Sequence, residues 1–329
     1  MTTPLPDELA WLTGSTDALA WLVVGLFVAA VALDWYDGDR GVGRARYLAA
    51  AAWVVFGVFW LVLFPHFAFV QRSFIEGALS LAALPACLYA AYLLVDGRET
   101  LFLLSRAVAF MGLIYLPFSL LFPAKSALIE LVTWQGEIVM DALGYGADLH
   151  VVERQEVTGG DGIIRGQYLF PNDQLGDFRV DVLLACTGLG SMAIFGGLIA
   201  AVRAPIRRKL RALAIAVSVI WVLNLARVVF ITLAFSQQWL QIFVDPTMAL
   251  VGYDNPNMVS YFISDRIIAQ SLSVVALVGI AWAVARELPE LLTVGEDVLY
   301  IATGDEYDLH EAVNAKASET AVRADGEGD

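Results

Sequence analysis

The chain has 329 residues, of which 59% are hydrophobic and only 16% are charged. This composition excludes an ordinary soluble domain of the same size and indicates a polytopic membrane protein. The 34 acidic residues outnumber the 20 basic ones, which argues against nucleic acid as a partner and is typical of a protein from a halophilic source.

Apolar runs long enough to cross a bilayer as helices recur along the chain. The first 17 residues lack the basic, apolar and small-residue succession of a cleavable signal, so we expect the first run to stay in the protein. A helix of about 20 residues spans the hydrocarbon core, so apolar runs of at least about 16 to 20 residues are taken as spans. Seven runs meet this criterion, at residues 18–33, 46–64, 74–95, 106–122, 181–202, 212–235 and 266–285.

Basic residues orient these seven runs. Arginine and lysine gather in the loops after the first, third and fifth runs, around Arg44, Arg98 and Arg207. Cytoplasmic loops carry an excess of these residues, so the three loops are predicted to face inward. The amino terminus then lies outside, together with two long polar segments, 123–180 and 236–265.

The first outer segment contains two predicted elements. Apolar and polar residues alternate with helical spacing over Ser126–Leu143, which favours an amphipathic helix at the outer interface, with an eighth span as the alternative. Residues 150–157 and 163–170 flank the glycine-rich turn Thr158–Gly162 and predict a β-hairpin. A hairpin with open edges cannot sit in lipid, so we expect it to cap the helix ends outside the membrane.

The predicted fold is therefore an all-α polytopic membrane protein with about seven transmembrane helices, an extracellular interfacial helix and a small β-hairpin cap. Residues 1–300 are expected to form the transmembrane domain. The acidic residues 301–329 are expected to form a disordered cytoplasmic tail.

Two cysteines occur, at different predicted depths, so no disulfide is expected between them. We interpret Cys87 as an inert packing residue. Cys186 lies near the start of the fifth run, and Thr187 follows it. Gly188, Gly190 and Ser191 leave room for a neighbouring backbone or a substrate peptide, although small residues also serve plain helix packing.

Two arginines lie in the later apolar runs. An intramembrane guanidinium is costly and usually marks function. Asn224 lies three residues before Arg227, and Gln270 lies four residues after Arg266, which predicts two polar stripes that face inward together. Arg266 starts its run, so an interfacial position remains an alternative. We expect no intramembrane carboxylate to neutralise these two cations.

The predicted topology brings the cysteine and both arginines to one depth. At 1.5 Å per helical residue, Cys186 lies about 7 Å and Arg227 about 12 Å below the outer surface, where the last run also begins. Two cations beside a thiol favour the nucleophilic thiolate and can stabilise the oxyanion that forms when it attacks a carbonyl. His150 is the one histidine placed to act as a base, and we do not assign it that role.

These residues resemble the exosortase and archaeosortase family: Ala185-Cys-Thr-Gly-Leu189 with Ser191, then Asn224-Leu-Ala-Arg227, then Arg266. Arginine at position 266, where many relatives look to carry histidine, is similar to the archaeosortase branch. The resemblance implies a thiol transpeptidase of the cell membrane with its active site at the extracellular side. Cys186 would be the nucleophile that forms a thioester, Arg227 the proton donor and Arg266 the transition-state stabiliser, with no metal and no cofactor.

The resemblance also implies the partners. The substrates would be secreted proteins, such as a surface-layer glycoprotein, with a carboxy-terminal sorting signal made of a Pro-Gly-Phe-like motif, a transmembrane helix and a basic tail. The acceptor would be a membrane phospholipid. Two rival interpretations remain: an anion transporter or channel in which Arg227 and Arg266 bind the anion and Cys186 is structural, and a membrane protease that hydrolyses without lipid transfer.

Overall fold

The computed structural model describes residues 10–37, 42–70, 74–156, 162–252 and 255–309. The chain divides into two compact units. Unit 1 comprises residues 1–111, 197–212 and 285–329, and unit 2 comprises residues 112–196 and 213–284. All three loops that we predicted to face inward belong to unit 1, whereas Cys186, Arg227 and Arg266 belong to unit 2.

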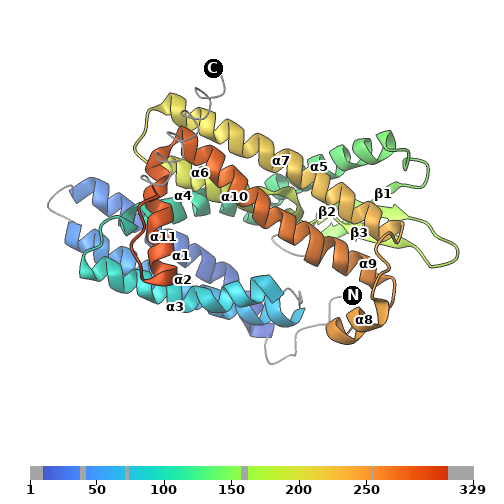
Figure 1. Ribbon diagram of the computed structural model, residues 1–329, viewed down its shortest axis with the longest axis horizontal. Helices are drawn as coiled ribbons and strands as arrows, with labels where there is room; N and C mark the ends of the chain where they lie inside the picture. Colours follow the sequence, from blue (N-terminus) through green and yellow to red (C-terminus); the bar gives the residue numbers. More distant parts are fainter. Residues whose placement is uncertain (1–9, 38–41, 71–73, 157–161, 253–254, 310–329) are drawn as a thin grey trace, which may run out of the picture. The chain divides into compact units, whose positions relative to one another are not determined.

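Helices make up most of the described residues (Figure 1). They are α1 (Ala10–Asp37), α2 (Val42–Pro65), α3 (Phe74–Asp96), α4 (Leu101–Leu120), α5 (Phe122–Ala142), α6 (Leu189–Ala201), α7 (Ile206–Ser236), α8 (Val244–Val251), α9 (Met258–Phe262), α10 (Gln270–Glu287) and α11 (Leu292–Thr303). Two π-helical segments, His66–Val70 and Ile263–Ala269, and two 3₁₀ segments, Leu184–Thr187 and Pro289–Leu291, lie between them.

Within the described residues, six helical segments are long and apolar enough to cross a membrane. They are Thr16–Tyr36, Gly43–Phe69, Ile75–Asp96, Leu101–Leu120, Ile206–Ser236 and Met258–Glu287, while Leu189–Ala201 is a shorter apolar helix. The predicted polytopic helical class is therefore confirmed. The two largest boundary errors are at the fifth run, which becomes helical at Leu189 rather than Asp181, and at the last span, which begins at Met258 rather than Arg266. The fourth and sixth spans also begin earlier than predicted, at Leu101 and Ile206.

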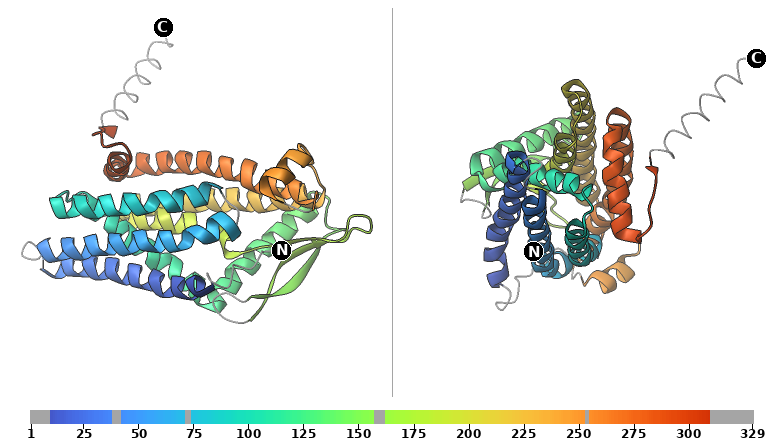
Figure 2. Two further views of the ribbon diagram at one scale, coloured as in Figure 1. Left: turned by 90° about the horizontal axis from the view of Figure 1, so that it is seen from below. Right: turned by 90° about the vertical axis from the view of Figure 1, so that its left-hand side faces the viewer.

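Unit 1 is built around α1, α2 and α3, which run side by side (Figure 2). Small buried residues such as Ala49 and Ala90 let these helices approach closely, as membrane helices require in the absence of a hydrophobic driving force between them. The ring of Phe27 meets that of Trp53 edge-on at 5.3 Å, and Trp53 Nε1 donates a hydrogen bond of 2.9 Å to Ser105 Oγ.

Ion pairs join the helix ends of unit 1. The guanidinium of Arg98 donates to buried Asp297 of α11 at 2.8 Å and to Glu306 at 2.9 Å. Arg208, at the start of α7, donates through both terminal nitrogens to Glu290. Helix α11 ends at Thr303, and residues 310–329 of the predicted tail lie outside the described part of the chain. The division at residue 300 stays a prediction.

The sheet of unit 2 has three antiparallel strands in the order β1 (His150–Glu156), β2 (Gly162–Phe170) and β3 (Phe178–Asp181) among the described residues. The two predicted strands are present with His150 opposite Leu169, and most of the predicted turn, residues 158–161, lies outside the described residues. The third strand was missed, since it has only four residues. Its partner β2 pairs Phe170 with Phe178, and the pattern continues as Val182 N donates to Gly166 O at 2.8 Å.

The sheet packs against helix α5 through strand β2 (Figure 1). This helix matches the predicted helix at 126–143 and starts earlier, with Pro123 in its first turn, where the missing proline N–H is not needed. The buried Tyr168 of β2 donates from its hydroxyl to the carbonyl of Thr133 at 2.8 Å. Gly136 makes room for this contact, because a Cβ there would lie 2.1 Å from the Tyr168 hydroxyl.

Candidate active site

Cys186 lies in the 3₁₀ turn between β3 and α6 rather than inside a transmembrane helix. Its N–H donates to Leu183 O at 2.8 Å, and the hydroxyl of Thr187 donates to Leu184 O at 2.7 Å. The side chain of Cys186 is partly buried against the hydrophobic core of unit 2. The turn therefore fixes the backbone of the cysteine at the junction of the sheet and α6, with Ser191 partly buried in the first turn of that helix.

Gly188 and Asn224 hold this turn against α7. Gly188 has φ +77°, a left-handed conformation that side chains disfavour, and it ends the 3₁₀ turn before α6 begins. A Cβ at this position would lie 3.2 Å from Asn224, so the glycine also permits the close approach of α7. At this short separation, Nδ2 of Asn224 donates a hydrogen bond to the carbonyl oxygen of Cys186.

Arg227 and Arg266 share one carboxylate. Arg227 Nη2 donates to Asp265 Oδ1 at 2.8 Å, and Arg266 Nε lies 3.4 Å from Asp265 Oδ2. The side chains of Arg227, Asp265 and Arg266 keep 33%, 9% and 18% of their surface exposed. Our expectation that no intramembrane carboxylate would neutralise the arginines was wrong.

Sequence reasoning missed Asp265 because it ended the outer segment at that residue. In the structure the segment Ile263–Ala269 is a π-helix that continues α9 into α10, so Asp265 lies about two turns inside a helical segment that begins at Met258. π-helical turns are rare and frequently found at functional sites. The apolar residues Val259, Phe262 and Ile263 before Asp265 were the signal that the helix starts earlier.

The charges of Arg227, Asp265 and Arg266 all act on the Cys186 thiol. The structure thus places the three predicted residues in one neighbourhood of unit 2, together with Asn224 and the newly found Asp265. Two guanidinium groups and one carboxylate leave one net positive charge beside the thiol. The surroundings are less positive than the sequence predicted, and burial raises the pKa of the Cys186 thiol by more than the two guanidinium groups lower it. The expectation that the arginines favour the thiolate was therefore wrong for the protein without substrate, whereas the single net charge still matches the one negative charge of an oxyanion.

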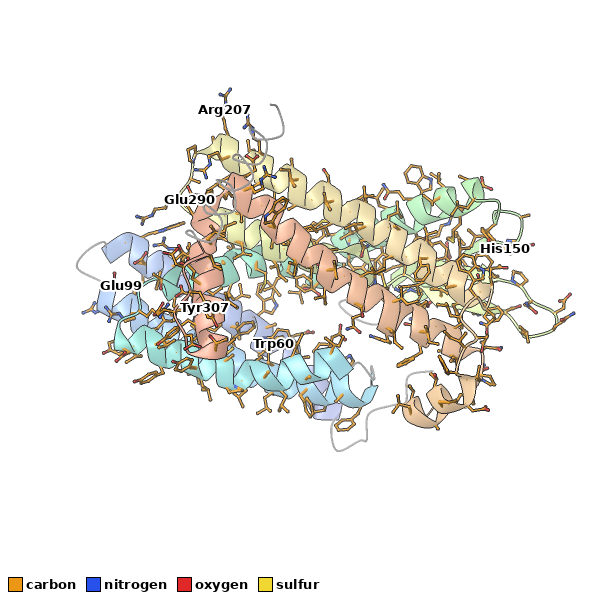
Figure 3. The ribbon with its side chains drawn as sticks, viewed as in Figure 1. Trp60, Glu99, His150, Arg207, Glu290 and Tyr307 are labelled. Carbon is orange, nitrogen blue, oxygen red and sulfur yellow. The ribbon has the colours of Figure 1, made fainter. Side chains whose placement is uncertain are left out.

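Two further residues were considered from the sequence, His150 and Gln270. His150 is the exposed first residue of β1 (Figure 3), and it is not among the described groups whose charge acts on Cys186. Gln270 is the partly buried first residue of α10, one residue after the π-helix. Their predicted roles, none for His150 and support for Gln270, stay predictions.

Residues 11–254 match the family model described as transmembrane exosortase. The chain therefore belongs to the transmembrane exosortase family, and together with its apolar helices this makes it a multi-pass membrane protein. Within curated proteins it is 50% identical to archaeosortase A of Haloferax volcanii over 304 residues, which cover 89% of this chain and 96% of that protein. It is 46% identical to archaeosortase A of Natronomonas pharaonis over 300 residues, which cover 90% and 91%. No solved structure matches the chain.

Proposed function

We propose that the chain is a membrane-embedded sorting transpeptidase of the archaeosortase type. It cleaves the carboxy-terminal sorting signal of secreted proteins and joins the protein to a membrane phospholipid at the extracellular side. The family and the two relatives support the reaction class. The observation that carries the proposal is that Arg227 and Arg266, joined through Asp265, both act on the thiol of Cys186.

In the first half of the reaction, the Cys186 thiolate attacks the carbonyl carbon of the scissile peptide bond. The tetrahedral oxyanion collapses to a thioester and releases the hydrophobic helix of the signal with a free amine. The proton that the thiol gives up is the proton that the departing amine takes up. In the second half, an amine of a lipid headgroup attacks the thioester, an amide forms and the thiol is restored.

The two arginines have different tasks in this proposal. Among the described residues, Arg227 Nε is buried and has no hydrogen-bond partner, although its Nη2 is engaged with Asp265. An unpaired buried donor is unfavourable, so this N–H suits the substrate. Arg227 acts as a hydrogen-bond donor that orients the leaving nitrogen while it takes up the proton that the thiol gave up, and its guanidinium stays ionised. Arg266 stabilises the oxyanion by its charge, since a guanidinium stays ionised throughout.

Trapping the acyl-enzyme tests the proposal. A substrate carrying a sorting signal is expected to form an adduct on Cys186 that hydroxylamine releases. The Cys186→Ala variant is expected to form none and to leave a substrate that keeps its carboxy-terminal helix. Retained processing in Cys186→Ala contradicts the enzyme and favours the transporter interpretation. A product with a free carboxylate instead of a lipid contradicts the transfer step and favours a hydrolytic protease.

A further inference from the structure

Asp265 is a carboxylate whose charge acts on the Cys186 thiol, together with the charges of Arg227 and Arg266. Its two oxygens are used separately: Oδ1 accepts from Arg227 on α7, and Oδ2 faces Arg266 on the same π-helix. The side chain keeps only 9% of its surface exposed. A carboxylate this deeply buried is unfavourable unless charged partners surround it, and two guanidinium groups do so here.

The carboxylate fixes the direction of both guanidinium planes. Arginine side chains are long and have many rotamers, and two of them in one neighbourhood repel each other. A shared carboxylate offsets the repulsion, because it holds Arg227 by a charge-assisted hydrogen bond and Arg266 by an ion pair. The contact with Arg227 joins α7 to the π-helix, so it also sets the distance between the two helices that supply the cations.

Tyr261 lies one helical turn before Asp265 on the same helical segment, and its hydroxyl interacts with the Asp265 carboxylate. The ring of Tyr261 packs edge-on against Phe235 of α7 at 5.7 Å, and Phe235 packs edge-on against Phe178 of β3 at 5.1 Å. The sheet that carries Cys186 at its end is therefore connected to Asp265 through three aromatic rings.

We infer that Asp265 is the positioning residue of this site. It orients Arg227 and Arg266 toward the carbonyl that Cys186 attacks, and its negative charge leaves the three groups with a net charge of one positive unit. The inference rests on the proposed transpeptidase function. Asp265 touches neither the substrate nor the reacting sulfur in this role. Its effect on the reaction passes through the two arginines.

The inference predicts that loss of the Asp265 charge has opposite effects on turnover and on the reactivity of the Cys186 thiol. Asp265→Asn keeps the shape of the side chain but loses its charge, so the arginines lose their common acceptor while the surroundings of Cys186 become more positive. We expect turnover in the sorting reaction to fall about a hundredfold, with KM little changed, as misplaced catalytic groups do. Alkylation of Cys186 is expected to become faster, and more so with anionic iodoacetate than with neutral iodoacetamide.

The experiment uses the full-length protein in membranes, with Cys87→Ala as the background so that Cys186 is the only cysteine. Asp181→Asn is the matched control: it is an exposed aspartate of β3 that accepts from Gln167 Nε2, and its amide form keeps that bond. It is expected to leave turnover and the ratio of the two alkylation rates unchanged. Asp265→Glu keeps the charge and moves the carboxylate by one methylene, so turnover should fall while the alkylation ratio stays.

Full turnover in Asp265→Asn or in Asp265→Glu overturns the inference. Reduced turnover in Asp265→Asn with an unchanged alkylation ratio also overturns it, because the variant then acts without changing the charge at the thiol. If Asp265→Asn does not accumulate in membranes, the turnover of Asp265→Glu decides whether the inference stands. Cys186→Ala separates the two proposals: if it processes substrate, the proposed function fails, whereas an inactive Cys186→Ala with a fully active Asp265→Asn removes only the role of Asp265.

Discussion

At the scale of single residues, Gly188 is a precise test of the turn that carries Cys186. Gly188→Ala forces a side chain into a left-handed conformation, which is unfavourable by roughly 1–2 kcal/mol, and places its Cβ 3.2 Å from Asn224. The hydrogen bond from Asn224 to the Cys186 carbonyl is then lost. We expect sorting turnover to fall more than tenfold in a substrate-processing assay, with a small decrease in Tm.

Gly190 supplies the matched control for this change. It lies two residues further along, and a Cβ there would meet no atom within 4 Å. Gly190→Ala is therefore expected to process substrate at the normal rate. Equal activity of the two alanine variants contradicts the role that we give to the turn at Gly188.

The planar shape of Arg227 is a second prediction at this scale. Arg227→Lys keeps the charge, but an ammonium on a flexible stem cannot place one donor on Asp265 and a second on the substrate. We expect turnover to fall by about 10²-fold or more, as when an oxyanion-hole donor is removed. Arg165→Lys is the control, because Arg165 of β2 makes an exposed ion pair with Glu137 of α5 at 3.2 Å.

Much of the site could be predicted from residues alone, for a physical reason. A cysteine that is followed by small residues is unusual in an apolar run, and an arginine in an apolar helix is unfavourable in lipid. Both features therefore stand out in the sequence. Asp265 did not stand out, because it lies next to Arg266 at the edge of an apolar run and reads as part of a polar loop. The apolar residues Val259, Phe262 and Ile263 before it are the sequence signal that the helix begins at Met258 and that Asp265 is an internal residue.

At the scale of elements, the sequence predicted long regular segments well and short irregular ones poorly. The apolar runs and the amphipathic pattern of α5 extend over many residues, so their periodicity is clear. The 3₁₀ turn at Cys186 and strand β3 have four residues each and depend on tertiary contacts, such as that of Asn224 with Cys186. The π-helix has no local sequence pattern that separates it from an α-helix.

The docking of the sheet on α5 gives a third prediction. Gly136→Ala would place a Cβ 2.1 Å from the Tyr168 hydroxyl, so β2 must move away and the bond to Thr133 O breaks. Overpacking of this kind lowers the free energy of unfolding by about 1–3 kcal/mol. We expect a lower Tm for the purified protein in detergent, together with slower sorting, because the same sheet leads into the Cys186 turn.

Two further variants give this test its control and its rescue. Gly279→Ala in α10 adds a Cβ that meets no atom within 4 Å, so its Tm should not fall. The double variant Gly136→Ala with Tyr168→Phe removes the hydroxyl that collides, so it should be more stable than Gly136→Ala alone. A double variant whose losses simply add would argue against a direct contact between the two positions.

At the scale of the whole molecule, charge and chemistry divide between the two units. The basic loops predicted to face the cytoplasm all belong to unit 1, where Arg98 and Arg208 find carboxylate partners and the exposed Arg207 projects from the start of α7 (Figure 3). The sheet, Cys186 and both intramembrane arginines belong to unit 2. This division is the pattern expected if unit 2 contains the extracellular face, which stays a prediction.

Labelling from outside the cell tests that sidedness. In a background with Cys87→Ala and Cys186→Ala, one cysteine is introduced at Asp173 in the exposed loop between β2 and β3, and in a second variant at the exposed Asp305 after α11. A membrane-impermeant maleimide is expected to label Asp173→Cys on intact cells and Asp305→Cys only after lysis, because basic loops stay inside. Labelling of Asp305→Cys on intact cells reverses the topology and places the Cys186 site on the cytoplasmic side, where secreted proteins do not reach it.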